Sequence, residues 1–329
     1  MTSSDTIARA GALAAGLKQQ ARATDENGLS AEQVALLAEA GLLRAADPAT
    51  IMEIGRALAQ GCGASAWLAT SFASAAVLAG PDVEGPITLA GLPDQHSLEQ
   101  RDGQVVVSGV WPTVGGLDHA DWILLSGLTW AGEAVCGLVS VKDAMATAYA
   151  YRGGLRGLVW RSVELKQASV RLIPLGVEGR AAPDEAALLL GALLGVAQGA
   201  YADYVGSTRA RISGVGGQAV AQFTQVQARL AESHAELKAL AGLYADVLER
   251  TASGDAAHAE CIRDRAYIAR KSVEAVNRLL SQMGAMGLAE TNPVQRRFRD
   301  LRALASTPGL DWTQQMPAFG RHELGLGAV

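Results

Sequence analysis

The chain has 329 residues and a formal net charge of −5, so it is long enough for about two domains with a sizeable buried core. It carries no basic stripe, which argues against a nucleic-acid surface. The three cysteines, Cys62, Cys136 and Cys261, lie far apart and lack metal-ligand spacing, so neither a disulfide framework nor a metal site is expected.

Residues 1–82 are predicted to form an N-terminal helical domain. The sequence Ser30-Ala-Glu-Gln33 has the form of a capping box, which marks a helix start. Pro48 opens the next helix, Gly61-Cys-Gly63 ends it, and Ser65 starts a third, apolar helix. The N-terminus itself has the pattern of an amphipathic helix and not of a targeting signal.

Residues 83–178 change character and are predicted to form a middle β domain. Short β-branched runs bounded by Gly, Asp or Pro are strand signals. At least four occur here: QVVVSGV, DWILLSGL, EAVCGLVSV and WRSVELKQASVRLIP. Strands at this density predict a small β-barrel or sandwich.

Residues 179–329 return to the helical period and are predicted to form a C-terminal helical bundle. Long helices are expected at about 183–213, 217–252 and 255–288, with glycine-containing breaks between them. Short connections between antiparallel neighbours favour a bundle. The predicted fold class is therefore mainly α with a middle β domain.

The first of these helices contains no charge between Glu185 and Asp203 and is about as long as a membrane span. Its richness in Ala and Gly favours a buried helix instead. We therefore expect a cytoplasmic protein that does not cross a membrane. An apolar helix without a polar outer face also favours association through the bundle.

Several segments together resemble the acyl-CoA dehydrogenase superfamily. GVWPTVGGLDHADW (109–122) resembles the family's G-x-x-W-I-T-N-G motif followed by A-D-W. Residues 154–157, 223–232 and 293–305 resemble its G-x-R-G, F-Q-x-x-Q-x-x-L-A and P-V-x-R-x-x-R-D elements. The matches follow the family's order along nearly the whole chain. They imply its fold, an N-terminal helical domain, a β domain and a C-terminal four-helix bundle, with flavin between the last two.

Within the superfamily, GRALAQGCGASAWLATS and the ending His119-Ala-Asp-Trp122 look most like the flavin-dependent monooxygenase branch. In that branch a separate flavin reductase supplies reduced flavin to the oxygenase. The resemblance implies an oxidoreductase that holds FAD or FMN and oxygenates a small organic substrate. It also implies a homodimer or homotetramer.

By the same resemblance, Trp111, Thr113 and Gly115 are candidate flavin contacts. A Thr hydroxyl can bond the polar edge of the ring, a Trp can cover its face, and Gly lets the backbone approach. The alternative is a hairpin with core tryptophans. His119 is the candidate catalytic acid or base, because histidine suits proton transfer near neutral pH. The alternative is a turn residue beside Asp121.

Two further candidates lie in the bundle. The resemblance implies that Arg211, at the end of a long helix, reaches the flavin phosphates of a neighbouring subunit, for which its planar group is suited. A solvated helix end is the alternative. Gly284 and Gly287 align with the family's Q-x-x-G-G-x-G, but Ser281 and Ala285 replace a glutamine and a glycine. FAD and FMN therefore both stay open.

Three departures from the family leave alternatives. No T-E-P-x-x-G-S-D loop stands between Pro86 and Gly103, the C-terminal Y-E-G glutamate is missing, and Thr307 stands where the branch has a histidine. The first alternative is an FAD-dependent acyl-CoA dehydrogenase. The second is a non-catalytic homologue or a subunit of a mixed assembly. The dehydrogenase would need a carboxylate base, for which the C-terminal candidates are Glu290, Asp311 and Glu323.

Overall fold

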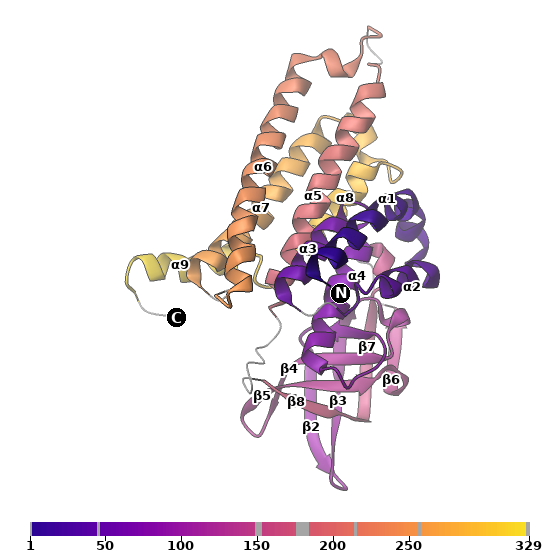
Figure 1. Ribbon diagram of the computed structural model, residues 1–329, viewed down its shortest axis with the longest axis vertical. Coiled ribbons are helices and arrows are strands. Elements are labelled where there is room, and N and C mark those ends of the chain that lie inside the picture. The colour runs from indigo at the N-terminus through magenta and orange to yellow at the C-terminus, as the bar shows by residue number, and fades with distance from the viewer. Residues whose placement is uncertain are drawn as a thin grey trace.

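The protein has a helical part and a sheet part, the sheet lying at the lower end of the view in Figure 1. The computed structural model describes residues 2–44, 47–148, 153–175, 184–213, 216–255 and 258–326. The chain runs from helices through strands and back to helices, which is the predicted order.

The N-terminal helices are α1 (Ser3–Asn27), α2 (Ala31–Glu39), α3 (Pro48–Ala59) and α4 (Gly63–Ala79). The predicted capping box is confirmed: the Ser30 hydroxyl accepts from the Gln33 backbone, and the Gln33 side chain accepts from the Ser30 backbone. Pro48 is the first residue of α3, as expected for a residue without a backbone donor. Helix α4 begins at Gly63, slightly before the predicted start at Ser65.

The strands form one eight-stranded sheet in the order β6-β7-β3-β1-β4-β5-β8, with β2 paired to β3. Their bounds are β1 (Ile87–Ala90), β2 (Gln95–Arg101), β3 (Gln104–Val114), β4 (Trp122–Trp130), β5 (Glu133–Ser140), β6 (Ala144–Ala148), β7 (Arg161–Ser169) and β8 (Arg171–Pro174). Strands β1 and β4 pair in parallel, and the other pairs are antiparallel.

The C-terminal helices are α5 (Glu185–Ala210), α6 (Thr224–Ala252), α7 (Ala259–Ser281), α8 (Pro293–Ala305) and α9 (Trp312–Glu323). Helix α6 starts later than predicted because Gly216 and Gly217 adopt positive φ angles of 78° and 63°. Helix α7 ends earlier than predicted, and Gly284 behind it also has a positive φ, of 58°.

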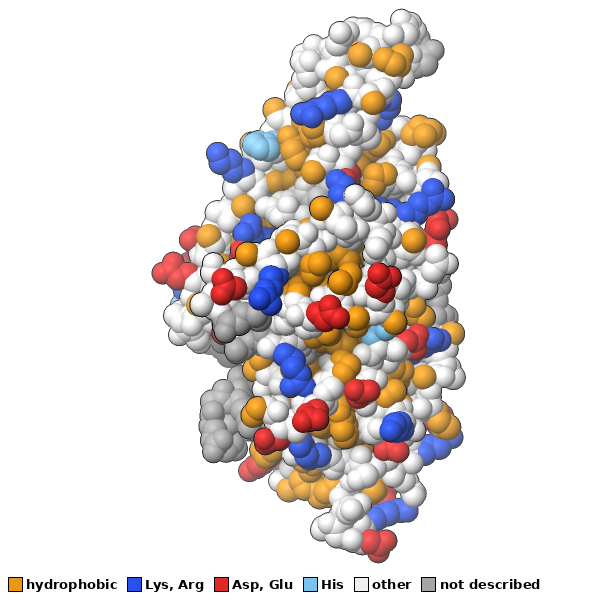
Figure 2. Space-filling view, turned by 45° about the vertical axis from the view of Figure 1, so that its right-hand side comes forward, with side chains coloured by type: hydrophobic (Ala, Val, Ile, Leu, Met, Phe, Trp, Pro, Cys, Tyr) orange, Lys and Arg blue, Asp and Glu red, His pale blue; other side chains and the backbone are white. Residues whose placement is uncertain are grey.

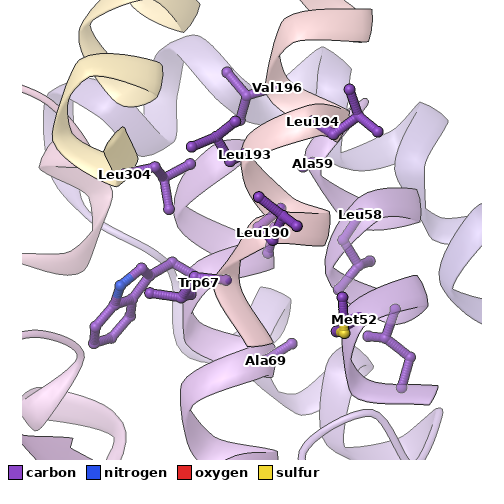
Figure 3. Close-up of a cluster of buried hydrophobic side chains, with 14 of the residues drawn as sticks. Met52, Leu58, Ala59, Trp67, Ala69, Leu190, Leu193, Leu194, Val196 and Leu304 are labelled. Atoms are coloured by element: carbon purple, nitrogen blue, oxygen red, sulfur yellow. The ribbon is translucent and has the colours of Figure 1, made fainter. Parts of the chain in front are cut away.

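One hydrophobic core joins the N-terminal helices to the bundle, and Figure 3 shows part of it. Side chains of α3, α4, α5 and α8 meet there, among them Met52, Leu58, Trp67, Leu190, Leu193, Leu194 and Leu304. The sheet has a core of its own around Val107, Trp111 and Val114. The division into domains 1–82, 83–178 and 179–329 stays a prediction, and its second boundary lies outside the described residues.

Helix α5 is the central element of the shared core. It is long and apolar enough to cross a membrane, yet 78% of its apolar window is buried inside the protein. A Cβ at Gly191 would lie 1.9 Å from the Met52 carbonyl oxygen, so the glycine lets α3 approach the α5 backbone directly. The expectation of a buried helix therefore agrees with its place in the fold.

The guanidinium of Arg297 on α8 ties several helices together. Its Nε lies 2.5 Å from Asp203 of α5, and its other nitrogens donate to the carbonyls of Ala59 at 2.8 Å and Gln60 at 2.5 Å. Lys18 of α1 contacts Asp203 at 2.6 Å. The Arg297 and Asp203 side chains are only 4% and 5% exposed, so each charge depends on the other.

Asp300 lies one helical turn beyond Arg297 and is also buried, at 6% exposure. Its carboxylate accepts the backbone N–H of Leu155 at 2.7 Å. Burial raises the pKa of Asp300 to about 6, against the opposing effect of the Leu155 bond and of Arg299 and Arg296.

Replacing Arg297 with Met is expected to lower the free energy of unfolding by about 3 kcal/mol, because the buried Asp203 keeps only Lys18 as a partner among the described residues and the carbonyls of Ala59 and Gln60 lose their donor. Urea denaturation measures this loss. Arg302 is exposed on the same helix, so Arg302→Met is the matched control and should change stability by less than about 0.5 kcal/mol. Equal losses in the two variants would contradict the assigned role.

The Asp300 pKa also predicts a pH dependence of stability. Because the folded value of about 6 exceeds the ordinary 3.8, the native state holds this proton more tightly than the unfolded chain. The contribution of this group to stability therefore grows as pH falls from 7 to 4, by up to about 3 kcal/mol, and is lost as pH rises through 6. Melting temperatures measured across this range should show the increment in the wild type and not in Asp300→Asn.

Candidate functional site

A cavity of about 540 Å³ lies where the sheet meets the helical part, a volume typical of small-molecule sites. Its wall combines α4, the end of β1, the end of β3, the middle of β4, the segment before β7, the start of α5, and the end of α8 with the turn behind it. The lining residues are Trp67, Leu89, Gly91, Leu92, Thr113, Ser126, Leu155, Trp160, Asp184, Glu185, Ala186, Ala303, Ser306, Thr307, Pro308 and Gly309.

Two β-bulges turn hydroxyl groups into this cavity. The pairing of β3 with β7 shifts between Trp111 and Val114, and both residues are fully buried in the sheet core. Strict alternation would place them on opposite faces, so the bulge puts Thr113 on the cavity side. A second register shift in β4 accompanies Ser126, which also lines the cavity. Thr113 thus lines the cavity, and its contact with a flavin ring stays a prediction.

A pair of tryptophans forms the aromatic part of the wall. The rings of Trp67 on α4 and Trp160 before β7 meet edge to face, with centroids 5.2 Å apart. A Cβ at Gly115 would lie 2.9 Å from the Trp160 ring and 3.1 Å from the Trp67 ring. The absence of a side chain at Gly115 therefore leaves space for the two rings. Gly115 packs behind these rings and does not itself line the cavity. Its direct contact with flavin stays a prediction.

Neither Trp67 nor Trp160 is among the site residues predicted from the sequence. The signal for Trp67 was present, because it ends the A-x-G-C-G-S-x-A-W-like segment that resembles the monooxygenase branch. Trp160 follows Val159, whose positive φ of 47° turns the chain just before β7. Nothing in the residue pattern before that strand indicates such a turn.

Trp111, in contrast, lies away from the cavity. Its side chain is fully buried with Val107 and Val163 in the core of the sheet, and it is not one of the lining residues. The bulge that presents Thr113 leaves Trp111 on the core face. This position favours the alternative of a core tryptophan, and a contact between Trp111 and flavin stays a prediction.

His119 is the last residue of a short 3-10 turn, Leu117–His119, that follows Gly116. It is partly buried and does not line the cavity. The neighbouring Asp118 pairs with Arg161 at 2.8 Å, which fixes the turn against β7. The structure thus does not bring His119 to the cavity, and the role of a turn residue accounts for its position.

Arg211 and Gly284 both lie where bundle helices α5 and α7 end, and neither lines the cavity. Arg211 donates to the carbonyl of Gln282 at 3.1 Å, and its Nη1 is buried with no hydrogen-bond partner among the described residues. Gly284 faces open space. Met286 and Leu288 beside it are 65% and 77% exposed. A flavin role for this cluster requires a second subunit and stays a prediction.

The candidate bases for dehydrogenase chemistry do not reach the cavity. Glu290 is 76% exposed and pairs with Arg156 at 3.3 Å. Asp311 caps α9 by accepting the backbone N–H of Gln314, and Glu323 is exposed at the end of that helix. The arrangement therefore disfavours the acyl-CoA dehydrogenase alternative.

The carboxylates that do line the cavity stand at the start of α5. Asp184 caps the helix by accepting the Ala187 N–H at 3.0 Å and pairs with the buried Arg265, so its charge is compensated. Glu185 follows it, and Thr307 faces the cavity from the other side. Among the described residues no group of three His, Cys, Asp or Glu is arranged to hold a metal ion.

These residues fit a flavin ring. The Thr113 hydroxyl can bond its polar edge, and apolar groups such as Leu89, Leu155 and the tryptophan rings can cover its faces. Gly91 adds an open stretch of backbone, since a Cβ there would meet nothing within 4 Å. The cavity can therefore hold a flat, largely apolar ligand with few directional contacts.

Comparison with known proteins defines the class. Residues 188–312 match the family model described as acyl-CoA dehydrogenase, C-terminal domain. The HsaA monooxygenase of M. tuberculosis has the same fold, with a TM-score of 0.83 at 22% identity over 100% of this chain and 99% of that one. The chain thus has the acyl-CoA dehydrogenase fold predicted from its sequence.

The relatives belong to the monooxygenase branch of that class. The oxygenase subunit HsaA of a flavin-dependent monooxygenase from Rhodococcus jostii (strain RHA1) is 23% identical over 325 residues, covering 85% of each chain. XiaF from Streptomyces sp., in complex with FADH2 and glycerol, superposes with a TM-score of 0.81 at 17% identity over 99% of this chain and 96% of that one. The predicted resemblance to flavin-dependent monooxygenases is confirmed.

Gly115→Ala is expected to lower the free energy of unfolding by about 1–3 kcal/mol, because the added methyl group overlaps both tryptophan rings. Gly91→Ala, which adds the same group at a roomy position of the same wall, is the control and should leave stability nearly unchanged. Thermal unfolding measures both. Near-UV circular dichroism of the tryptophans should change only in Gly115→Ala.

Proposed function

We propose that this chain is the oxygenase component of a two-component flavin-dependent monooxygenase. It would hold reduced flavin in the 540 Å³ cavity and act there on a small organic substrate. The observation that carries this proposal is the convergence of the Thr113 hydroxyl and the Trp67–Trp160 pair on one cavity between sheet and helices. The names of the relatives support the same class of reaction.

Bound flavin supplies the oxygen chemistry, and the protein positions the reactants and keeps water away. Thr113 would bond the polar edge of the ring. Trp67 and Trp160 would cover it, and Leu155 with Ala303 would close the apolar side of the cavity. These are binding and shielding roles, and none of them requires a charged side chain.

The substrate we propose is an uncharged, flat molecule. Among the described residues the cavity wall has no Lys, Arg or His, so an anionic group would find no ionic partner there. The available polar contacts are the hydroxyls of Thr113, Ser126, Ser306 and Thr307 and, at the start of α5, the carboxylates of Asp184 and Glu185. With Thr307 facing the cavity, no histidine at that position removes a proton from the substrate.

Two kinds of protein partner accompany this function. The relative's name as an oxygenase subunit supports a separate flavin reductase. We also propose a homodimer or homotetramer formed through the end of the bundle, where Ile212, Met286 and Leu288 are exposed beside Arg211. On the face shown in Figure 2, acidic and basic side chains are interspersed without a continuous basic stripe, which favours protein partners over nucleic acid.

Flavin binding separates the proposal from its alternatives. Anaerobic titration, followed by fluorescence and absorbance, should show tight binding of reduced FMN or FAD and weaker binding of the oxidised form. Tight binding of oxidised FAD would favour the dehydrogenase instead. If neither flavin binds in either state, the chain is a non-catalytic homologue and the proposal is wrong.

Thr113→Val keeps the shape of the side chain and removes its hydroxyl. Loss of one hydrogen bond to the ring is expected to weaken binding of reduced flavin about tenfold. Ser126→Ala removes another hydroxyl of the same cavity, which already donates to the Ala90 carbonyl at 3.0 Å, and serves as the control. Equal effects of the two substitutions would argue against a direct contact from Thr113.

A further inference from the structure

Leu155 forms part of the cavity wall in an unusual backbone conformation. Its side chain is 2% exposed, and its φ is 53°, in the left-handed region that non-glycine residues rarely adopt. Val159, which closes the same short turn, has a φ of 47°. Such residues keep this conformation only when their surroundings hold them. The position of this part of the wall is therefore set by contacts outside the turn.

Two successive side chains of helix α8 supply the contacts nearest Leu155, while the backbone amides of Leu29 and Gly116 donate to carbonyls further along the turn. Asp300 accepts the Leu155 N–H at 2.7 Å, and Arg299 donates to the Gly153 carbonyl at 2.9 Å. Between them, a Cβ at Gly154 would lie 2.1 Å from the Arg299 carbonyl oxygen, so loop and helix are in direct backbone contact. The loop is clamped to α8 from behind the cavity.

We propose that Asp300 is a positioning residue for the cavity: its ionised carboxylate holds the Leu155 backbone, and thereby fixes the wall that the ligand contacts. Asp300 itself does not line the cavity, so it acts through Leu155. This inference rests on the proposed function for the choice of flavin as the cavity probe. The hydrogen bond on which it depends is independent of that choice.

The packing around Asp300 leaves no room for a ligand beside its carboxyl group. The space beside it measures about 10 Å³, room for no more than a water molecule. The polar groups around it come from α1, α8, the turn before α4 and the loop itself. They are Asp25, Cys62, Arg156, Arg296, Arg297 and Arg299. The Asp300 carboxyl is thus enclosed where the loop packs against the helices.

Ionisation decides how strongly Asp300 holds the loop. A carboxylate accepts a backbone N–H more strongly than a neutral carboxyl group does. Burial raises the pKa of Asp300 to about 6, with Asp25 acting in the same direction and the Leu155 bond, Arg299 and Arg296 opposing it. The bond to Leu155 is therefore strong above pH 6 and weakens as pH falls below it, whereas the fold as a whole gains stability there because the buried carboxyl is then neutral.

The test compares binding of reduced FMN to the wild type and to Asp300→Asn between pH 5 and pH 8. If titration selects FAD, reduced FAD is used instead. The ratio of the two dissociation constants at each pH cancels the ionisation of the ligand. We expect the variant to bind about tenfold more weakly at pH 8 and within about twofold of the wild type at pH 5, where Asp300 is protonated. Glu323→Gln, which removes an exposed acid at the end of α9 away from this loop, should match the wild type throughout.

A ratio that stays constant with pH, or lies within twofold of one at pH 8, would overturn the inference. Amide hydrogen exchange in the wild-type protein tests the clamp without ligand or variant. After correction for intrinsic rates, the Leu155 amide should lose protection from pH 8 to pH 5 while the amides of α8 do not. Unchanged or rising protection at Leu155 would contradict the proposal, even if the protein binds no flavin and the proposed function fails.

Discussion

The buried ion pair between Arg297 and Asp203 is the interaction on which the arrangement of the helices depends. A guanidinium taken out of water needs several acceptors, and Arg297 finds them on α3 and α5 at once. The pair therefore specifies how the N-terminal helices sit against the bundle, which apolar packing alone leaves less precisely defined. Helix α8 carries this arginine and, one turn later, the residues that reach the sheet.

The position of the cavity follows from that arrangement. Its wall needs Trp67 from the N-terminal helices, Thr113 from the sheet and Thr307 from behind α8. None of these three parts of the chain forms the cavity alone. Fixing α8 against α5 and α3 fixes one side, and the clamp on residues 153–155 joins the sheet to the same helix. Stability and ligand binding thus depend on one helix.

The sequence predicted the order of the elements and the capping box at Ser30, because these depend on local pattern or on a family motif. It also singled out Thr113, which lines the cavity and whose contact with flavin stays a prediction. It did not predict β2, whose residues are polar and exposed because the strand pairs with only one neighbour. It also did not show that Trp111 and Val114 both face the sheet core, since that depends on the irregular pairing between them. Alternation along a strand cannot reveal a bulge, and spacing cannot place Trp160 against Trp67.

The sheet lies, in chain order, between two helical blocks that share one core. Helices α4 and α5 pack together although the whole sheet separates them in sequence. Their contact therefore closes a long loop, which carries an entropic cost that grows with loop length. Such non-local contacts slow folding. During synthesis the N-terminal helices emerge with their apolar faces unpaired until α5 and α8 arrive. The N-terminal helices can therefore be fully buried only after the C-terminal helices have been synthesised.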